Sequence, residues 1–379
     1  MVDRRLPTDE SRDLMILVRD IAATELAPQA DEYERESRFP REVFATLGRA
    51  GLMSLPFDEE YGGGGQPYVV YLQALEELAS AWLTVGIGVS VHTLSCFALA
   101  EYGTPEQRDS WLADMIGGAQ LGAYCLSEPQ AGSDAAALQT RAVLDDGAYV
   151  VNGTKSWITH GGVADFYSAM VRTSDDGARG ITCLLVNSDT DGVSAPVAER
   201  KMGATASRTA SVVFDNVRVD ASRRIGAEGE GFRIALSALD AGRLGIAACS
   251  VGLAQSALDC ATSYAKTRRQ FGRPIADFQG LQFMLADMAT AVTAARALYL
   301  EAAARRDAGL DFGMQAAMAK LFASDTAMRV ATDAVQILGG AGYVTDFPAE
   351  RYFREAKVLQ IVEGTNQIQR MVIGRGLVR

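Results

Sequence analysis

Apolar residues recur every three or four positions through the first third of the chain. The clearest examples are Leu14, Leu17, Val18 and Ile21, and later Leu72, Leu75 and Leu78. This spacing is typical of helices that bury one face, so residues 1–120 are predicted to form an all-α N-terminal domain. Glycines at positions 62–65, followed by Pro67, interrupt the pattern and predict a loop.

Residues 121–228 have a different pattern, with short runs rich in β-branched and aromatic residues at 148–151, 181–186 and 210–214. Such runs predict β-strands. The dipeptides between them are typical of tight turns and indicate antiparallel hairpins. These dipeptides are Asp146-Gly147, Asn152-Gly153 and Asp191-Gly192.

The helical pattern returns at residues 229–379. Residues 232–269 contain no proline, which predicts one helix of about 57 Å at about 1.5 Å per residue. A helix that long needs neighbours along its length, and further helical patterns follow at 281–308, 315–338 and 365–377. We therefore expect a C-terminal four-helix bundle, and an α+β multidomain protein as a whole.

Composition narrows the class of protein. The chain has 379 residues and is 48% hydrophobic, which is enough to bury a large core in two or three domains. With 36 basic and 47 acidic residues its net charge is -11, which argues against nucleic-acid and anionic-membrane partners. Five cysteines without C-x-x-C spacing and only two histidines indicate neither a disulfide framework nor a metal site.

Localisation is predicted from the first residues and from one uncharged stretch. The N-terminus runs into charged sequence without a secretory signal, so a cytoplasmic protein is expected. Residues 78–100 carry no charge and are long enough to cross a membrane. Their many serines, threonines and glycines make them too polar for lipid, so we expect buried core helices.

Glu363 is the most informative single residue. It follows an apolar run containing Val358, Leu359, Ile361 and Val362 and directly precedes a glycine. Apolar surroundings raise the pKa of a carboxyl group, and a glycine lets a substrate approach the backbone, as a general base requires. Taken locally, the segment is also a helix N-cap, with the carboxylate near the positive helix end.

Residues 126–134 lie between the first helical segment and the β segment. They combine hydroxyls, glycine-compatible turns and exposed N–H groups, which suit a polar heterocycle or a phosphate. Ordinary turn chemistry explains the same residues. Trp157 and Thr159 are expected at a strand end, where a tryptophan alone usually indicates core packing. Since the chain has no G-x-G-x-x-G motif, any dinucleotide site is not of the Rossmann type.

Five motifs in register resemble those of the acyl-CoA dehydrogenases, closest to the short-chain (butyryl-CoA) branch, and the resemblance covers essentially the whole chain. They are residues 126–134, Trp157-Ile158-Thr159, Arg268-x-x-Phe271-Gly272, Gln336-Ile337-Leu338-Gly339-Gly340 and Glu363-Gly364-Thr365. The resemblance implies three domains (1–120, 121–228 and 229–379), the central one a β-barrel, and a homotetramer with one FAD per subunit.

The resemblance also implies the cofactor contacts. The flavin would touch Tyr124, Leu126, Ser127, Gly132 and Ser133, and would be covered by Trp157, Ile158 and Thr159. Arg268, Phe271, Gln279, Gln336, Ile337, Gly339 and Gly340 resemble residues that reach the FAD of a neighbouring subunit. Thr365 and Gln367 would hold the phosphate and ribityl side.

For substrate, the resemblance implies acyl-CoA contacts from Ser133, Asp240, Arg243 and Gly364, with Arg243 facing the nucleotide portion. Without the family, Asp240 and Arg243 are equally a surface i,i+3 pair. Glu363 would take the α-proton while flavin takes the β-hydride, which gives a trans-2-enoyl-CoA and passes electrons to electron-transfer flavoprotein. Some members carry the base at the position of Gly242, where a glycine cannot serve.

Two residues depart from the family pattern. Val362 stands where many members have tyrosine, and His160 where asparagine is frequent; for His160 we expect a solvated loop residue rather than a flavin contact. The alternatives to a CoA-specific enzyme are a dehydrogenase of acyl groups tethered to a carrier protein and a non-catalytic scaffold. Chain length and branching of the substrate are not determined by the sequence.

Overall fold

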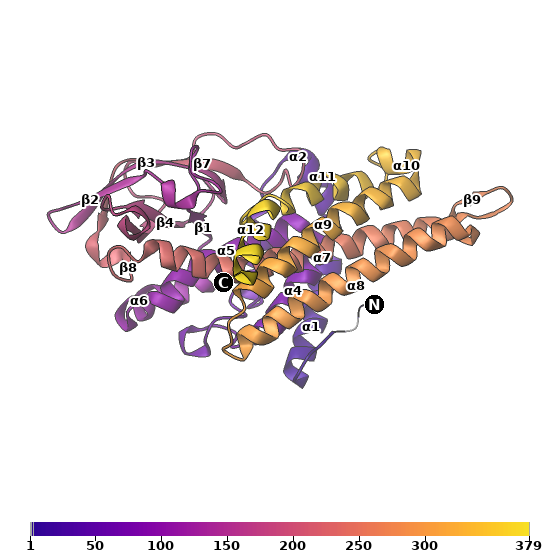
Figure 1. Ribbon diagram of the computed structural model, residues 1–379, viewed down its shortest axis with the longest axis horizontal. Coiled ribbons are helices and arrows are strands. Elements are labelled where there is room, and N and C mark those ends of the chain that lie inside the picture. Colours follow the sequence, from indigo (N-terminus) through magenta and orange to yellow (C-terminus); the bar gives the residue numbers. More distant parts are fainter. Residues whose placement is uncertain (1, 3, 379) are drawn as a thin grey trace.

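The computed structural model describes residues 2 and 4–378. A β domain lies at one end of an elongated assembly of helices, which both the N-terminal and the C-terminal segments build (Figure 1). The N-terminal helices are α1 (Asp9–Ile21), α2 (Ala30–Glu36), α3 (Arg41–Arg49), α4 (Tyr68–Ala81), α5 (Leu83–Tyr102) and α6 (Pro105–Ile116), with a π-helical turn at Ala22–Leu26. The C-terminal helices are α7 (Gly231–Thr267), α8 (Gln279–Asp307), α9 (Gly313–Leu338), α10 (Gly340–Tyr343), α11 (Ala349–Leu359) and α12 (Asn366–Leu377).

Helix α7 is the central element of the helical assembly. It packs against α8 and α9 and also against α4 and α5, so the two helical segments share one hydrophobic core. Small residues allow this close packing: a Cβ built on Gly252 would lie 2.4 Å from the carbonyl oxygen of Glu76 on α4. The predicted long helix is confirmed, and α8, α9 and α12 begin and end within two residues of their predicted limits.

The β domain is a sheet and not the closed barrel that we expected. Its strands are β1 (Gly122–Cys125), β2 (Arg141–Asp145), β3 (Ala148–Thr159), β4 (Phe166–Arg172), β5 (Ile181–Asn187), β6 (Val193–Ser194), β7 (Thr209–Asp220) and β8 (Arg224–Ile225). They follow the order β6-β7-β3-β2-β4-β5-β8, and β1 pairs in parallel with β4. The end strands β6 and β8 have two residues each and do not pair with one another, so the sheet stays open.

Only one of the three turn dipeptides joins a hairpin. Asp146-Gly147 connects β2 to β3, with φ of 44° and 76°. Asn152-Gly153 instead lies inside β3 at a register shift, where a Cβ on Gly153 would lie 2.6 Å from Thr140 Oγ1. Asp191-Gly192 precedes β6, which pairs with β7 and not with β5. A glycine after asparagine or aspartate therefore also marks bulges and loops here.

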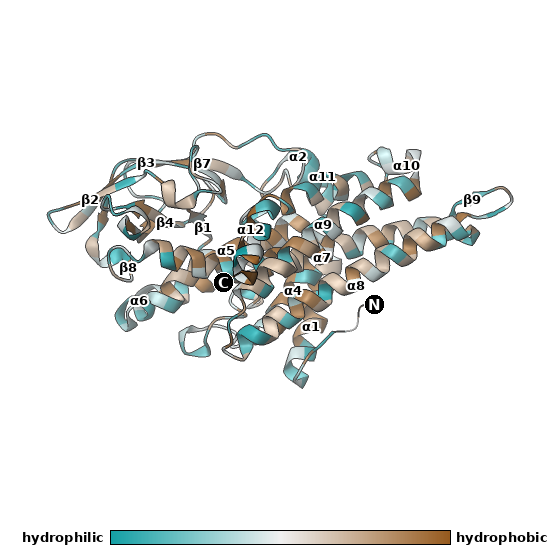
Figure 2. Cartoon of the chain, in the orientation of Figure 1, coloured by the Kyte–Doolittle hydropathy of each residue, from teal (hydrophilic) through white to brown (hydrophobic). Residues whose placement is uncertain are grey.

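Within the part of the chain that the structure describes, three helices are long and apolar enough to cross a membrane. Of the most apolar 18-residue window, 94% is buried in α5 (Leu83–Tyr102), 78% in α7 and only 33% in α8. The hydropathy colouring shows brown residues gathered where α4, α5, α7 and α9 meet (Figure 2). The uncharged stretch at 78–100 is thus a core element, as predicted, whereas α8 leaves apolar side chains uncovered.

Beyond α7, a short hairpin of β9 (Arg269–Gln270) and β10 (Arg273–Pro274) projects from the end of the helical assembly that lies away from the β domain (Figure 1). Phe271 lies at its tip and is 92% exposed, with φ of 50°. This end of the molecule therefore presents side chains about 50 Å from the β domain, at about 1.5 Å per residue of α7.

Candidate active site

Glu363 lies in the loop between α11 and α12 with both carboxylate oxygens buried. Within the described residues, neither oxygen has a hydrogen-bond partner. Burial raises the pKa of Glu363 to about 7, although Lys320 and Arg243 act in the opposite direction. A buried carboxylate without donors is costly in a structural role, because its charge is neither solvated nor paired. Near neutral pH it is a strong acceptor for a proton brought to it.

The backbone of this loop aims the carboxylate. Glu363 has φ of 52° and Gly364 has φ of 89°, so two consecutive residues adopt the left-handed conformation. Non-glycine residues adopt it at a cost of about 1 kcal/mol or more. A Cβ on Gly242 of α7 would lie 2.2 Å from Glu363 Oε2, so the carboxylate rests against the α7 backbone. Gly242 therefore provides the space that the base occupies.

The apolar surroundings of Glu363 differ from those we expected. Of the preceding residues, Leu359 is fully buried, but Ile361 is 52% exposed and points away. The pocket is lined instead by residues of the loop before α4, α4, α5, α7 and α8. These are Pro56, Phe57, Tyr68, Ser90, Thr93, Leu94, Phe97, Glu101, Ala241, Gly242 and Arg306. The sequence predicts that residues 78–100 and 242–252 set the depth of the pocket, and these stretches contain Ser90, Thr93, Leu94, Phe97 and Gly242; the other lining residues gave no signal, because they are far apart along the chain.

The helix-cap interpretation of this segment is also correct, and the capping residue is Thr365. Thr365 is the N-cap of α12, and its hydroxyl accepts a hydrogen bond from the Ile368 N–H at 3.3 Å. Glu363 takes no part in the cap. Capping and the placement of a free carboxylate are therefore done by different side chains of one loop.

Asp240 and Arg243 form the ion pair that their spacing indicated, but Arg243 is buried. Its side chain is 7% exposed and donates to Asp240. Its guanidinium is enclosed and acts electrostatically on Glu363, and a contact with the nucleotide portion of CoA stays a prediction. Asp240 remains partly exposed, and Gly364 lies beside the base.

The loop at 126–134 is held in place by a buried ion pair that the sequence did not reveal. Lys155 Nζ lies 2.7 Å from Glu128 Oε1, and both side chains are at most 2% exposed. Glu128 also accepts hydrogen bonds from the N–H groups of Gln139 and Thr140. Charges held in this way fix the loop rigidly. Leu126 is buried, Tyr124 and Ser127 are half-buried, and Gly132 and Ser133 are exposed.

Trp157 is not a core residue. Its side chain is 65% exposed and its φ is 63°, whereas Ile158 is buried and Thr159 half-buried at the end of β3. An exposed indole at a strand end leaves an aromatic face open for a flat heterocycle. The core-packing alternative is therefore wrong.

His160 is a buried histidine, which corrects the expectation of a solvated loop residue. It is fully buried between Phe39 and Phe44, and its Nδ1 lies 2.9 Å from the Gly122 carbonyl oxygen. Burial lowers its pKa to about 4, so the ring is neutral at pH 7. It joins α3 to the β domain. No pattern in the sequence indicates that His160 is buried, because Phe39 and Phe44 are more than a hundred residues away along the chain.

Of the remaining predicted cofactor residues, Gln367 is exposed in the first turn of α12, close to the Glu363 loop, and the others lie at the far end of α7. Tyr124 is placed near the start of α7, where its hydroxyl donates to the Ala235 carbonyl at 3.4 Å. Arg268 follows the last residue of the same helix, about 50 Å away. Phe271, Gln279, Gln336, Gly339 and Gly340 are exposed at this distal end, whereas Ile337 is a core residue. One chain therefore does not bring the two sets together.

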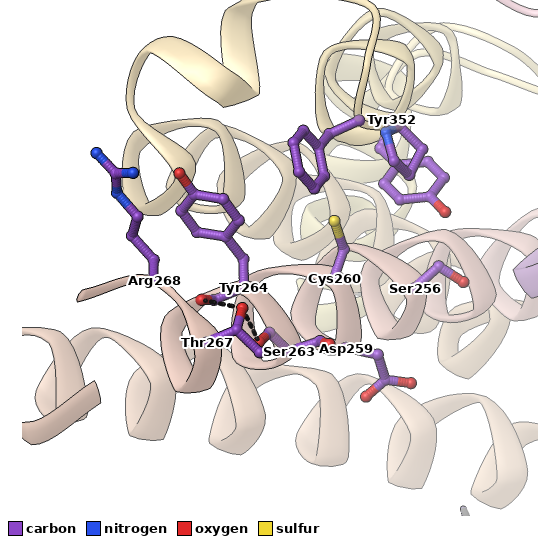
Figure 3. Close-up of a pocket in the computed structure, with 10 residues that line it drawn as sticks. Ser256, Asp259, Cys260, Ser263, Tyr264, Thr267, Arg268 and Tyr352 are labelled. Carbon is purple, nitrogen blue, oxygen red and sulfur yellow. Dashed lines mark hydrogen bonds between the residues drawn. The ribbon is translucent and has the colours of Figure 1, made fainter. Parts of the chain in front are cut away.

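A groove lies beside Arg268 at this distal end. Cys260, Tyr264 and Arg268 project from one face of α7 toward Tyr352 of α11 (Figure 3). Phe347 packs edge-on against Tyr264, with ring centroids 5.4 Å apart. The groove is open to solvent on the side of the exposed hairpin, so it offers a surface that a second molecule can reach.

Comparisons with known proteins agree with this architecture. Three family models match in succession: the acyl-CoA dehydrogenase N-terminal domain over residues 8–119, the middle domain over 123–217 and the C-terminal domain over 229–378. An acyl-CoA dehydrogenase of Bacillus subtilis is 45% identical over 98% of both chains. The short-chain-specific acyl-CoA dehydrogenase of Clostridium acetobutylicum is 43% identical over 98% of this chain and 99% of that one.

Solved structures extend the match. Butyryl-CoA dehydrogenase from Megasphaera elsdenii superposes with a TM-score of 0.97, 41% identity and full coverage of both chains. A chain in a structure on the electron transferring flavoprotein of Acidaminococcus fermentans gives the same TM-score at 43% identity, again with full coverage. Fold and matches together define a flavin-dependent oxidoreductase that acts on CH–CH bonds. The chain belongs to the acyl-CoA dehydrogenase family.

The chain's own residues fit FAD. The open face of Trp157 and the rigid loop before Gly132 provide a flat surface and free backbone groups beside the β domain. At Gly132, Gly339 and Gly340 a built Cβ meets no atom within 4 Å, so these stretches of backbone are accessible. The distal set lies about 50 Å along α7 from Tyr124, too far to contact a cofactor held beside Tyr124 in the same chain.

Proposed function

We propose that Glu363 is the general base of an acyl-CoA dehydrogenase whose substrates are short acyl-CoA thioesters. The observation that carries the assignment is a carboxylate whose oxygens are both buried, have no partner among the described residues, and lie against Gly242, which lines a pocket. The short-chain relatives and the butyryl-CoA dehydrogenase neighbour support the substrate class.

The mechanism requires removal of a proton from the carbon next to a thioester carbonyl. Glu363, with a pKa of about 7, accepts this proton in a pocket that excludes water and so strengthens its basicity. Gly364 has no side chain, so the thioester lies close to the backbone, where the Glu363 N–H is placed to donate to the carbonyl oxygen. FAD, when bound, would supply the acceptor for the β-hydrogen as hydride. Trp157 and Thr159 hold and cover it.

The predicted cofactor residues at the distal end of α7 support the assembly of several subunits. Arg268, Phe271 and Gln279 reach the cofactor of a neighbouring subunit in this proposal, so each active site needs two copies. Helix α8 supports it independently, because two thirds of its apolar window is uncovered and Phe283 is 59% exposed. We therefore propose a homotetramer in the cytoplasm, without membrane association, that takes part in fatty-acid β-oxidation and passes its electrons to electron-transfer flavoprotein.

An acyl group on a carrier protein is the alternative substrate. A solved prolyl acyl carrier protein oxidase, AnaB, is also similar, with 27% identity and a TM-score of 0.94. The acyl-CoA interpretation has the closer relatives.

The test is a comparison of matched thioesters. Purified protein loaded with FAD should be yellow and should bleach with butyryl-CoA under anaerobic conditions. The same acyl group on a carrier protein should bleach it more slowly. Faster reaction with the carrier thioester would establish the alternative, and protein that takes up no FAD would contradict catalysis and favour a scaffold.

A further inference from the structure

The loop that carries Glu363 is attached to α9 through one buried lysine. Lys320 is fully buried, and its Nζ donates to the Gly364 carbonyl oxygen at 3.0 Å and to Asn366 Oδ1 at 2.9 Å. A buried ammonium without partners is strongly disfavoured, so these two acceptors fix its position. Both acceptors belong to the three residues that follow Glu363.

Two more α9 residues extend this attachment. Ser324 Oγ donates to Asn366 Oδ1 at 3.1 Å, and Asn366 Nδ2 donates to Asp325 Oδ1 at 2.7 Å. Lys320 and Ser324 are four residues apart and therefore share one face of the helix. That face of α9 thus holds the start of α12, while Asp325 also accepts from Gln360 Nε2 at 2.7 Å, before the loop.

From the other side, Gln369 Nε2 donates to the Gly364 carbonyl at 2.9 Å and to the Glu363 carbonyl at 3.2 Å. The loop backbone is thus hydrogen-bonded on both sides, whereas the Glu363 carboxylate accepts no hydrogen bond from the described residues. The direction of the carboxylate therefore depends on the backbone. Because Glu363 and Gly364 are both left-handed, that backbone needs external contacts to stay in place.

We propose that Lys320 is a positioning residue for the general base: it fixes the Gly364 carbonyl, which keeps Glu363 against Gly242, and it stabilises the ionised carboxylate by charge alone. The inference rests on the proposed role of Glu363. An ammonium bonded directly to the carboxylate would lower its basicity further and block the substrate. Bonding to the next carbonyl supplies the charge and leaves both oxygens free.

The pKa values agree with a Lys320 that bonds the Gly364 carbonyl and acts on the Glu363 carboxylate by charge only. Burial lowers the pKa of Lys320 to about 8, while that of Glu363 is about 7, so both groups are charged between these values. Lys320 is also near the charges of Asp325 and Arg243. The other titratable groups facing Glu363 are neutral at pH 7, because burial raises their pKa values. They are Tyr68 and Tyr71 of α4, Tyr124 of β1 and Cys249 of α7.

The variants Lys320→Met and Lys320→Arg test the proposal, with Lys357→Met as the matched control. Lys357 is an exposed lysine of α11 whose Nζ bonds Gln360 Oε1, and it does not act on Glu363. Two quantities are measured on each FAD-loaded tetramer from about pH 5 to about pH 9. One is the infrared carboxyl band of Glu363, assigned by its loss in Glu363→Gln; the other is the rate of flavin bleaching by butyryl-CoA.

For Lys320→Met, we expect the infrared midpoint to rise by about one pH unit, since an opposite charge is lost, and bleaching at pH 7 to slow about 10- to 100-fold. Lys320→Arg should keep the midpoint within about 0.3 unit but slow bleaching, because the larger guanidinium displaces Gly364. Lys357→Met should match the wild type in both.

An unchanged infrared midpoint in Lys320→Met would overturn the proposal, even if thermal stability fell, because a purely structural role does not shift the titration of Glu363. If that variant does not fold, Lys320→Arg decides: wild-type bleaching would refute the positioning role. The infrared titration needs no turnover, so it reports on Lys320 even if the wild type reacts with none of the thioesters. Such a lack of reaction would refute only the proposed function.

Discussion

Two buried glutamates in the helical core have opposite surroundings. Glu76 of α4 is fully buried and is held by Arg4, Arg296 and Tyr299, with Arg4 Nη1 and Arg296 Nη2 each 2.8 Å from its oxygens. Burial raises its pKa, but the two arginines outweigh it and lower the pKa below its usual value. Glu363 is half-buried as a residue, but its carboxylate oxygens are buried and have no partner among the described residues, and burial raises its pKa to about 7. The surroundings, and not the residue type, separate a structural anion from a base.

The comparison also explains where each residue is placed. Glu76 lies within a regular helix and ties the N-terminal segment to α8, so its partners come from 72 and 220 residues away. Glu363 lies on a strained loop at the junction of α7, α9 and α12. The strained backbone is tolerated because hydrogen bonds from Lys320 and Gln369 hold the loop. The carboxylate oxygens of Glu363 therefore stay available to substrate.

The largest expected effect is on catalysis at Glu363. Glu363→Gln keeps the shape but cannot accept a proton, so flavin bleaching by butyryl-CoA should slow by about 10³- to 10⁴-fold. FAD content and thermal midpoint should stay close to those of the wild type. Stopped-flow spectroscopy measures the rate, and a variant that still bleaches at more than a tenth of the wild-type rate would remove Glu363 from the mechanism.

Glu76→Gln should lower the stability of the protein and leave the rate of flavin bleaching unchanged, the opposite of Glu363→Gln. It leaves Arg4 and Arg296 buried without a carboxylate, and breaking a buried pair in this way costs about 3–5 kcal/mol of unfolding free energy. The folded fraction should retain its bleaching rate. Urea denaturation followed by circular dichroism gives the stability; Glu10→Gln, at an exposed carboxylate of α1, is the control. Loss of rate without loss of stability would contradict the structural role.

Gly242→Ala sharpens the comparison by disturbing Glu363 without removing it. The added methyl would lie 2.2 Å from Oε2, so the carboxylate must rotate away from its position. We expect bleaching to slow about 10- to 100-fold, because displacement of about 1 Å costs on that order. Gly280→Ala is a suitable control, since its Cβ meets no atom within 4 Å. Equal effects of the two substitutions would argue against the steric account.

The smallest effect concerns a third buried carboxylate outside the site. Burial raises the pKa of Glu355 to about 8 despite Arg351, and its Oε2 is unpartnered in the described chain. A raised pKa in the folded state gives stability that is fully present below about pH 4.5 and lost as pH rises toward 8. Glu355→Gln should therefore flatten this decline, by up to about 1.4 kcal/mol of unfolding free energy per pH unit. Denaturation at several pH values measures it; an unchanged slope would show that Glu355 is already ionised.

The sequence by itself determined the helical–β–helical order, because the two hydrophobic periods of about 3.6 and 2 residues depend only on local geometry. It also singled out Glu363 as a candidate base, but only through the family resemblance, because the apolar run, the carboxylate and the glycine by themselves fit a helix cap. Closure of the sheet was predicted wrongly, because pairing of the end strands β6 and β8 depends on contacts across the whole domain.

Only the tertiary structure decided what surrounds these residues. Lys320 of α9 bonds the Gly364 carbonyl and Gly242 of α7 lies against the Glu363 carboxylate, and no spacing in the sequence links these residues. The same holds for His160, which Phe39 and Phe44 enclose, and for Arg243, which folding buries. A pKa depends on burial and on charges within a few ångströms, and those distances exist only once the helices have packed.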